Sequence, residues 1–151
     1  MGEPDGIAFR PFGSVDLAAC LRLFDANCPE FFAPAEQADY RAFLATEPDG
    51  YELCVAGGRV VGAFGLIGDD PRSRRLNWIM LDPAFRGRGL GSAIMSRVLA
   101  SARRAGVRVI EIAASHKSAP FFDRFGASPV RVTEHGWGRD MHRVDMEIAL
   151  R

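Results

Sequence analysis

The chain has 151 residues, a length that suits one domain with a sizeable hydrophobic core and no disulfides. Its 19 basic and 19 acidic side chains cancel, so it lacks the net positive charge that favours nucleic acid or acidic membranes. Cys20, Cys28 and Cys54 show neither zinc-ligand spacing nor a disulfide framework. We therefore expect a single domain over residues 1–151, with no metal site and no nucleic-acid partner.

The N-terminus and the hydropathy pattern predict a cellular location. The first six residues are acidic and lack an apolar core, which a secretory signal would need. No segment approaches the roughly 18 consecutive apolar residues of a membrane-spanning helix. The expectation is a cytoplasmic protein without a membrane partner.

A strand and two helices are predicted first along the chain. Residues 7–12 suit a strand, and Ser14 is a good N-cap for the apolar residues at helical spacing that follow it. This helix should end near residues 27–29. A second helix is expected over residues 34–44, because proline is favoured in a first helical turn.

Three strands should follow as an antiparallel meander. Residues 51–56 and 59–67 are rich in strand-forming residues, and the Gly57-Gly58 pair between them is typical of a two-residue hairpin turn. Residues 74–81 form the third strand, which ends at Asp82-Pro83 because proline cannot continue a ladder.

The rest of the chain predicts a mixed α/β fold. An apolar stripe starts at Leu90 and predicts a helix that ends near Gly106, followed by a strand over residues 107–113. A strand, a helix and a strand in this order favour a right-handed parallel crossover. A short helix over residues 119–125 and strands over 128–133 and 141–150 complete the fold. We expect an antiparallel N-terminal meander joined to a central parallel strand pair, with helices on both faces.

The segment Arg86-Gly87-Arg88-Gly89-Leu90-Gly91-Ser92 carries the clearest functional signal. It lies between a predicted strand and a predicted helix. Glycines let the backbone approach a ligand, and the free N–H groups and dipole of a helix start bind anions. The two arginines add positive charge, so the segment predicts a phosphate-binding loop.

Other phosphate-binding loops fit this segment less well. A nucleotide-triphosphate loop requires a lysine, which the segment lacks. The dinucleotide fingerprint requires glycine where Ser92 stands, and it opens a βαβ unit instead of following a meander. A glycine-rich connection without a ligand is the remaining alternative.

The segment resembles the signature of the GNAT superfamily of acyl-CoA N-acyltransferases: Arg or Gln, two residues, Gly, one residue, then Gly or Ala. Arg86, Gly89 and Gly91 match it, after a lead-in, Leu81-Asp82-Pro83-Ala84-Phe85, similar to the family's hydrophobic-Asp-Pro-x-aromatic sequence. The run Phe121-Phe122-Asp123-Arg124-Phe125-Gly126-Ala127 is also similar to the family's Phe-Tyr-Glu-Lys-Leu-Gly-Phe segment. The resemblance covers nearly the whole chain.

This resemblance implies coenzyme A binding and direct transfer of an acetyl group from acetyl-CoA to a primary amine of a small molecule or peptide. The strand end would hydrogen-bond the pantetheine arm, and the glycine-rich loop and helix start would hold the pyrophosphate. Dimers are common in such families, so a homodimer is a further option. The implied cofactor-binding residues are Ile79, Met80, Leu81, Arg86, Gly87, Arg88, Gly89, Leu90, Gly91, Ser92, Ser115 and Phe122.

The sequence departs from the family at Phe122, where a tyrosine commonly protonates the leaving thiolate. His116 could replace that acid, or it could be a solvated loop residue. Glu111 could act as a base for the incoming amine, or it could face solvent from its strand. Because of Phe122, a CoA-binding sensor without turnover is a second hypothesis, and nucleotide hydrolysis is a third.

Aromatic residues on two connections are candidates for the acceptor site. In this family the corresponding loops often wall that site. Phe31 and Phe32 lie between the first two helices and could equally pack in the core. Trp137 lies between two glycines ahead of the last strand, which favours a ligand wall or a subunit contact.

Overall fold

The computed structural model describes residues 6–151, so the acidic N-terminal residues 1–5 lie outside the described part. The strands are β1 (Ile7–Pro11), β2 (Tyr51–Ala56), β3 (Arg59–Ile67), β4 (Ser73–Leu81), β5 (Val109–Ser115), β6 (Ser128–Gly138) and β7 (Met141–Ala149). The α-helices are α1 (Leu17–Ala26), α2 (Gln37–Ala45), α3 (Leu90–Arg104) and α4 (Ala119–Asp123). Single 3₁₀ turns precede α1 and α2 and follow β4, at Ser14–Asp16, Pro34–Glu36 and Pro83–Phe85.

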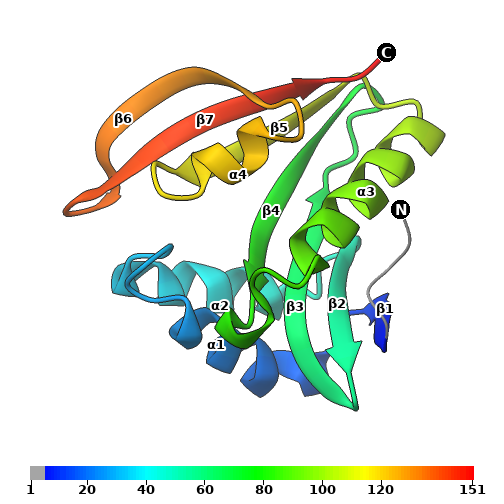
Figure 1. Ribbon diagram of the computed structural model, residues 1–151, viewed down its shortest axis with the longest axis vertical. Helices are drawn as coiled ribbons and strands as arrows, with labels where there is room; N and C mark the ends of the chain where they lie inside the picture. The colour runs from blue at the N-terminus through cyan, green and yellow to red at the C-terminus, as the bar shows by residue number, and fades with distance from the viewer. Residues whose placement is uncertain (1–5) are drawn as a thin grey trace.

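The strands form one seven-stranded sheet in the order β1-β2-β3-β4-β5-β7-β6. Strands β1 to β4 pair antiparallel, β4 and β5 pair parallel across the α3 crossover, and β5, β7 and β6 are again antiparallel (Figure 1). The predicted mixed α/β fold, with a meander joined to a central parallel pair, is confirmed.

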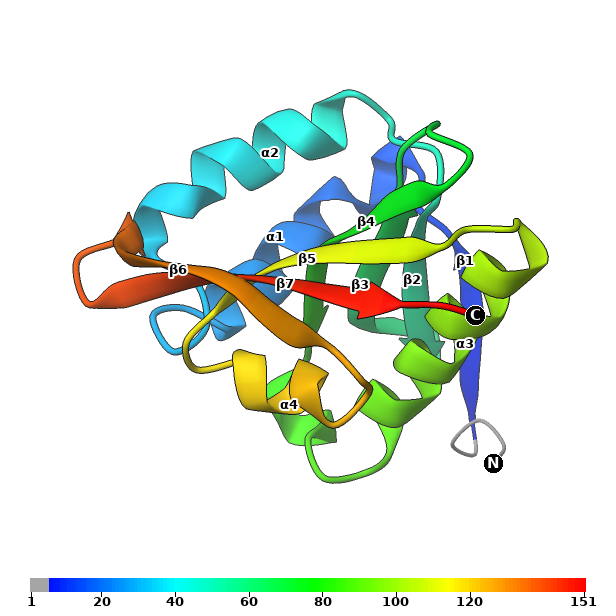
Figure 2. The same cartoon turned by 90° about the horizontal axis from the view of Figure 1, so that it is seen from above.

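Helices cover both faces of this sheet. Figure 2 shows α1 and α2 on one side and α3 and α4 on the other. Two hydrophobic clusters lie beneath them, one around Leu90, Ile94 and Ile110 and the other around Phe24, Tyr40 and Tyr51. Each helix pair therefore encloses its own core against the shared sheet.

The two central strands separate part of the way along their length. Residues Ser73–Leu76 of β4 pair with Val109–Ile112 of β5, and beyond this point the strands diverge (Figure 1). An extra residue in β4 opposite β3 makes a bulge, in which Trp78 has a φ of 48°. The facing edges of β4 and β5 are therefore open beyond Leu76 and Ile112, and a ligand can enter between them.

The last hairpin is longer than the sequence pattern predicts. Strand β6 reaches Gly138 through an irregular stretch after Thr133, so Trp137 lies at a strand end instead of in a loop. Histidine rings support this stretch, because Nδ1 of His142 accepts the N–H of His135 at 2.9 Å and Nδ1 of His135 accepts the N–H of Asp140 at 2.8 Å.

No helix within residues 6–151 is both long and apolar enough to cross a membrane. The same residues hold no group of three or more His, Cys, Asp or Glu side chains with the geometry of a metal site. Cys20, Cys28 and Cys54 form no disulfide bond within the described residues.

Candidate functional site

The glycine-rich loop presents its backbone amides at the start of α3. Gly87 and Gly89 have φ values of 73° and 83°, a left-handed conformation that favours glycine. Among residues 6–151, no carbonyl or side chain accepts a hydrogen bond from the N–H groups of Gly87, Arg88 or Gly89. The first amides of α3 add further donors without intrahelical partners. This loop has the chemistry of an anion site.

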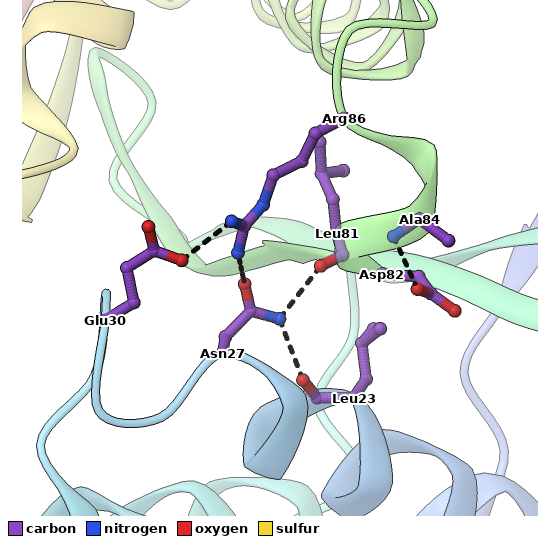
Figure 3. A network of polar contacts seen from close by, with 7 residues as sticks. All are labelled: Leu23, Asn27, Glu30, Leu81, Asp82, Ala84 and Arg86. Atoms are coloured by element: carbon purple, nitrogen blue, oxygen red, sulfur yellow. Dashed lines mark hydrogen bonds and ion pairs between the residues drawn. The ribbon is translucent and has the colours of Figure 1, made fainter.

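The side chain of Arg86 points toward Glu30 and Asn27, as Figure 3 shows. Its guanidinium donates to Oε1 of Glu30 at 2.7 Å and to Oδ1 of Asn27 at 3.1 Å. The amide of Asn27 in turn donates to the carbonyl of Leu81 at 2.8 Å. Arg86 therefore fastens the loop to the end of α1, and the Leu81 carbonyl is already engaged.

Arg88 and Leu90 can offer only their backbone amides to a ligand at this loop, because their side chains point elsewhere. The guanidinium of Arg88 lies 4.4 Å from the ring centre of Phe85, and its side chain does not line the cavity described next. Leu90 is 1% exposed and packs in the core.

A cavity of about 650 Å³ lies between the diverging strands and continues to the glycine-rich loop. Its walls come from β4, β5, α3, α4, the connection between α1 and α2, and the end of β6. The sequence-predicted residues that line it are Phe31, Phe32, Ile79, Met80, Leu81, Arg86, Gly87, Gly89, Gly91, Ser92, Ser115, Phe122 and Trp137.

The proposed catalytic candidates lie outside this lining. His116 is exposed, and its Nδ1 accepts the N–H of His142 at 3.1 Å. Glu111 is also exposed, and its Oε2 accepts a hydrogen bond from the Ser73 hydroxyl at 2.9 Å. The structure does not bring these two side chains together with the cavity-lining residues.

Ser115 and Phe122 lie on the wall formed by β5 and α4. The Ser115 hydroxyl accepts the N–H of Ser118 at 3.1 Å and thereby shapes the turn into α4. Phe122 is 3% exposed and lines the cavity with a ring that carries no proton donor.

Neither tyrosine of the chain replaces the missing phenol. Tyr40 of α2 and Tyr51 of β2 are buried in the same hydrophobic cluster, with their hydroxyl oxygens 2.7 Å apart, and Tyr51 donates to the Trp78 carbonyl. Burial raises the pKa of the Tyr51 hydroxyl well above its usual value. These tyrosines do not line the cavity, so their role in the structure is packing.

Aromatic residues and one carboxylate line the cavity from the connection between α1 and α2 and from the end of β6. The Trp137 indole donates to the Ala114 carbonyl at 2.9 Å, and Phe32 stacks on Trp78 at 5.9 Å between ring centres. Glu36 lines the same cavity and is 6% exposed. Burial is the main cause that raises the pKa of Glu36 to about 7.

Sequence reasoning missed Glu36. Its position two residues after Pro34 suits the first turn of a helix, and its Oε2 does accept the Ala33 N–H at 2.8 Å. A helix-capping glutamate is usually exposed, so its sequence position carries no signal of a cavity. The open β4 and β5 edges and the distant Trp137 create that cavity.

Comparisons with known proteins identify the family of this chain. The model of the Acetyltransferase (GNAT) family matches residues 19–127. The chain therefore belongs to the Acetyltransferase (GNAT) family.

The sequence identity to an individual curated relative is low. An uncharacterized N-acetyltransferase of Methanocaldococcus jannaschii is 27% identical over 114 residues, which is 70% of this chain and 50% of that protein. The chain thus spans about half the length of this curated relative.

Solved structures share the fold over most of their length. Ard1 from Thermoplasma volcanium has a TM-score of 0.81 at 17% identity, covering 97% of this chain and 99% of that one. A Salmonella typhimurium protein assigned as an acetyltransferase, whose structure was solved with its cofactor acetyl-CoA, has a TM-score of 0.70 at 18% identity. The match covers 96% of this chain and 94% of that one.

Proposed function

We propose that the protein is an N-acetyltransferase that moves an acetyl group from acetyl-CoA to a primary amine by direct transfer. The observation that carries this proposal is the glycine-rich loop, whose free backbone amides open into the cavity between β4 and β5. The acetyl-CoA bound to the Salmonella typhimurium protein supports the choice of donor.

The proposed donor would use two parts of this cavity. Its diphosphate would accept from the amides of Gly87 to Gly89 and the first turn of α3. Its pantetheine arm would lie along the open edge of β4 at Ile79 and Met80, where the backbone lacks a β5 partner. Acetyl-CoA supplies an activated thioester, and the protein supplies its position beside the acceptor.

Phe122 bears on the source of the proton for the leaving thiolate in the proposed reaction. No tyrosine lines the cavity within residues 6–151, so in the proposed reaction the thiolate takes its proton from the amine or from water and not from a phenol. A thiol has a pKa of about 8.5, so its thiolate is a tolerable leaving group. Loss of one general acid costs about 10²–10⁴ in rate, which leaves room for turnover.

Two measurements test this function. Calorimetry should show saturable binding of coenzyme A, and free thiol should appear from acetyl-CoA only when an amine is present. No heat of binding with coenzyme A would refute the assignment.

The alternative is a CoA sensor without turnover, which the phenylalanine at position 122 favours. Tight coenzyme A binding with no amine-dependent thiol release across a wide amine panel would support the sensor. Thiol release that depends on one class of amine would exclude it.

A further inference from the structure

The carboxylate of Glu36 is buried without a cationic partner in the part of the cavity lined by Phe32 and Trp137, which we call the acceptor end. Its Oε2 accepts the Ala33 N–H at 2.8 Å. The ion pairs found within residues 6–151 do not include it. Every fully buried side-chain oxygen in the described chain has a partner, yet no hydrogen bond to Oε1 of Glu36 is found, so Oε1 keeps accessible surface on a residue that lines the cavity.

A buried carboxylate without a cationic partner is expected to bind a cation. Burial disfavours the charged form of Glu36, and Asp39 nearby adds repulsion. A positively charged ligand at Oε1 would relieve both effects, because a buried charge is tolerated when it is paired. The cavity-facing oxygen is therefore suited to an ammonium group.

Aromatic side chains from two segments line the same cavity as Glu36. A Cβ placed on Gly138 would lie 3.1 Å from Cβ of Ala33, so the end of β6 meets the turn that holds Glu36. Figures 1 and 2 show the β6–β7 hairpin end beside the start of α2. Trp137 and Phe32 line the cavity from these two segments, and aromatic faces attract ammonium groups.

The cation found against an aromatic wall of the acceptor end is already paired: the Arg143 guanidinium lies 4.7 Å from the ring centre of Trp137, is ion-paired with Asp145 and does not line the cavity. The cationic residues that line the cavity in the described chain are Arg86, Lys117 and Arg124. Arg86 is bound to Glu30 and Asn27. Lys117 and Arg124 flank α4, which lies on the opposite face of the sheet from α2 (Figure 2).

We propose that Glu36, together with Phe32 and Trp137, binds the ammonium group of the acceptor and selects amines that carry no carboxylate beside the amino group. The substrate class is then alkyl or arylalkyl amines and peptide N-termini, not free α-amino acids. This inference rests on the proposed acetyltransferase function and names the acceptor of that same site.

The transfer balances with Glu36 in this role. The ammonium gives one proton to the Glu36 carboxylate, and the neutral amine forms an N–C bond to the thioester carbonyl carbon. The C–S bond then breaks, and the thiolate takes the second proton that leaves the nitrogen. Glu36 returns its proton to water.

Tryptophan fluorescence tests the inference without turnover, because the chain has two tryptophans, Trp78 and Trp137, and both line the cavity. The CoA-bound protein is titrated with phenethylamine and with phenylalanine, which differ by one carboxylate. Phenethylamine should quench saturably, with at least tenfold higher affinity than phenylalanine. Glu36→Gln should weaken phenethylamine at least tenfold, because Gln keeps an oxygen for the Ala33 N–H and loses the charge.

Glu134→Gln is the matched control, since Glu134 is exposed on β6 and does not line the cavity. It should bind both probes like the wild type. Equal affinity for the two probes, absence of quenching by phenethylamine, or unchanged affinity in Glu36→Gln would each overturn the inference. Calorimetry with coenzyme A on the same samples distinguishes failure of this inference from failure of the proposed function. If the proposed function is wrong, the wild type should not bind coenzyme A; if only the role of Glu36 is wrong, it should still bind.

Discussion

At the scale of single residues, Glu36 is expected to make stability depend on pH. Its folded-state pKa of about 7 lies above the ordinary value of 4.5. Between these values the folded protein binds more protons than the unfolded chain, so the free energy of unfolding falls as pH rises from about 4.5 to 7. The loss is on the order of 3 kcal/mol and is complete above pH 7.

Urea unfolding at pH 5, 6, 7 and 8 measures this dependence. Glu36→Gln should remove the part of the slope that Glu36 causes and should be more stable than the wild type at pH 8. The exposed Glu134→Gln should keep the wild-type slope. An identical slope in Glu36→Gln and wild type would show that Glu36 is not desolvated in the folded state.

Arg86 shows what could and could not be predicted for a single residue. The spacing of Arg86, Gly89 and Gly91 matched a signature, and the loop does present free amides to a cavity. The direction of the arginine side chain depends on Glu30 and Asn27, which lie 56 and 59 residues earlier. A local sequence pattern carries no information about such distant partners.

At the scale of elements, two glycines at the start of α3 should have different roles. Gly89 has a φ of 83°, and a Cβ added there would meet no atom within 4 Å, so Gly89→Ala introduces backbone strain of about 1–2 kcal/mol without a clash. Gly91 has an ordinary φ, and a Cβ there would lie 2.9 Å from the Phe121 ring. Gly91→Ala should therefore disturb the packing of α3 on α4.

Calorimetry with coenzyme A and thermal melting distinguish these roles. Gly89→Ala should lower CoA affinity at least tenfold, because relief of the strain turns the loop amides away from the diphosphate. Gly91→Ala should lose about 1–3 kcal/mol of stability from overpacking, with a smaller loss of affinity. Equal CoA affinity in Gly89→Ala and wild type would exclude the loop as the diphosphate site.

The predictability of elements follows how local their causes are. Strands β2 and β3 occur at the predicted residues 51–56 and 59–67, since strand-forming residues and a glycine turn define a hairpin locally. The predicted end of β6 at residue 133 was several residues too early, because histidines on β6 and β7 hold the irregular part of the strand that follows. The bulge at Trp78 also had no local signal, since it depends on the pairing of β4 with β3.

At the scale of the whole molecule, the divergence of β4 and β5 leaves the two parts of the sheet joined by few contacts. Four residue pairs connect these strands, and the cavity occupies the space beyond them. A ligand in that cavity would touch β4 and α3 on one side and β5 and α4 on the other. It would therefore supply contacts that the sheet itself lacks.

Coenzyme A should accordingly stabilise the fold more than other phosphate ligands. At 100 times its Kd, a ligand that binds only the folded state adds about 2.7 kcal/mol, which corresponds to a Tm increase of roughly 5–10 °C for a domain of this size. ATP offers phosphates to the loop amides of Gly87 to Gly89 but has no pantetheine arm for the open edges of β4 and β5. Thermal melting with each ligand at the same concentration should show a clear Tm increase with coenzyme A and a much smaller one with ATP. A larger Tm increase with ATP than with coenzyme A would favour the nucleotide hypothesis. It would show that a pantetheine arm between β4 and β5 does not contribute to ligand binding.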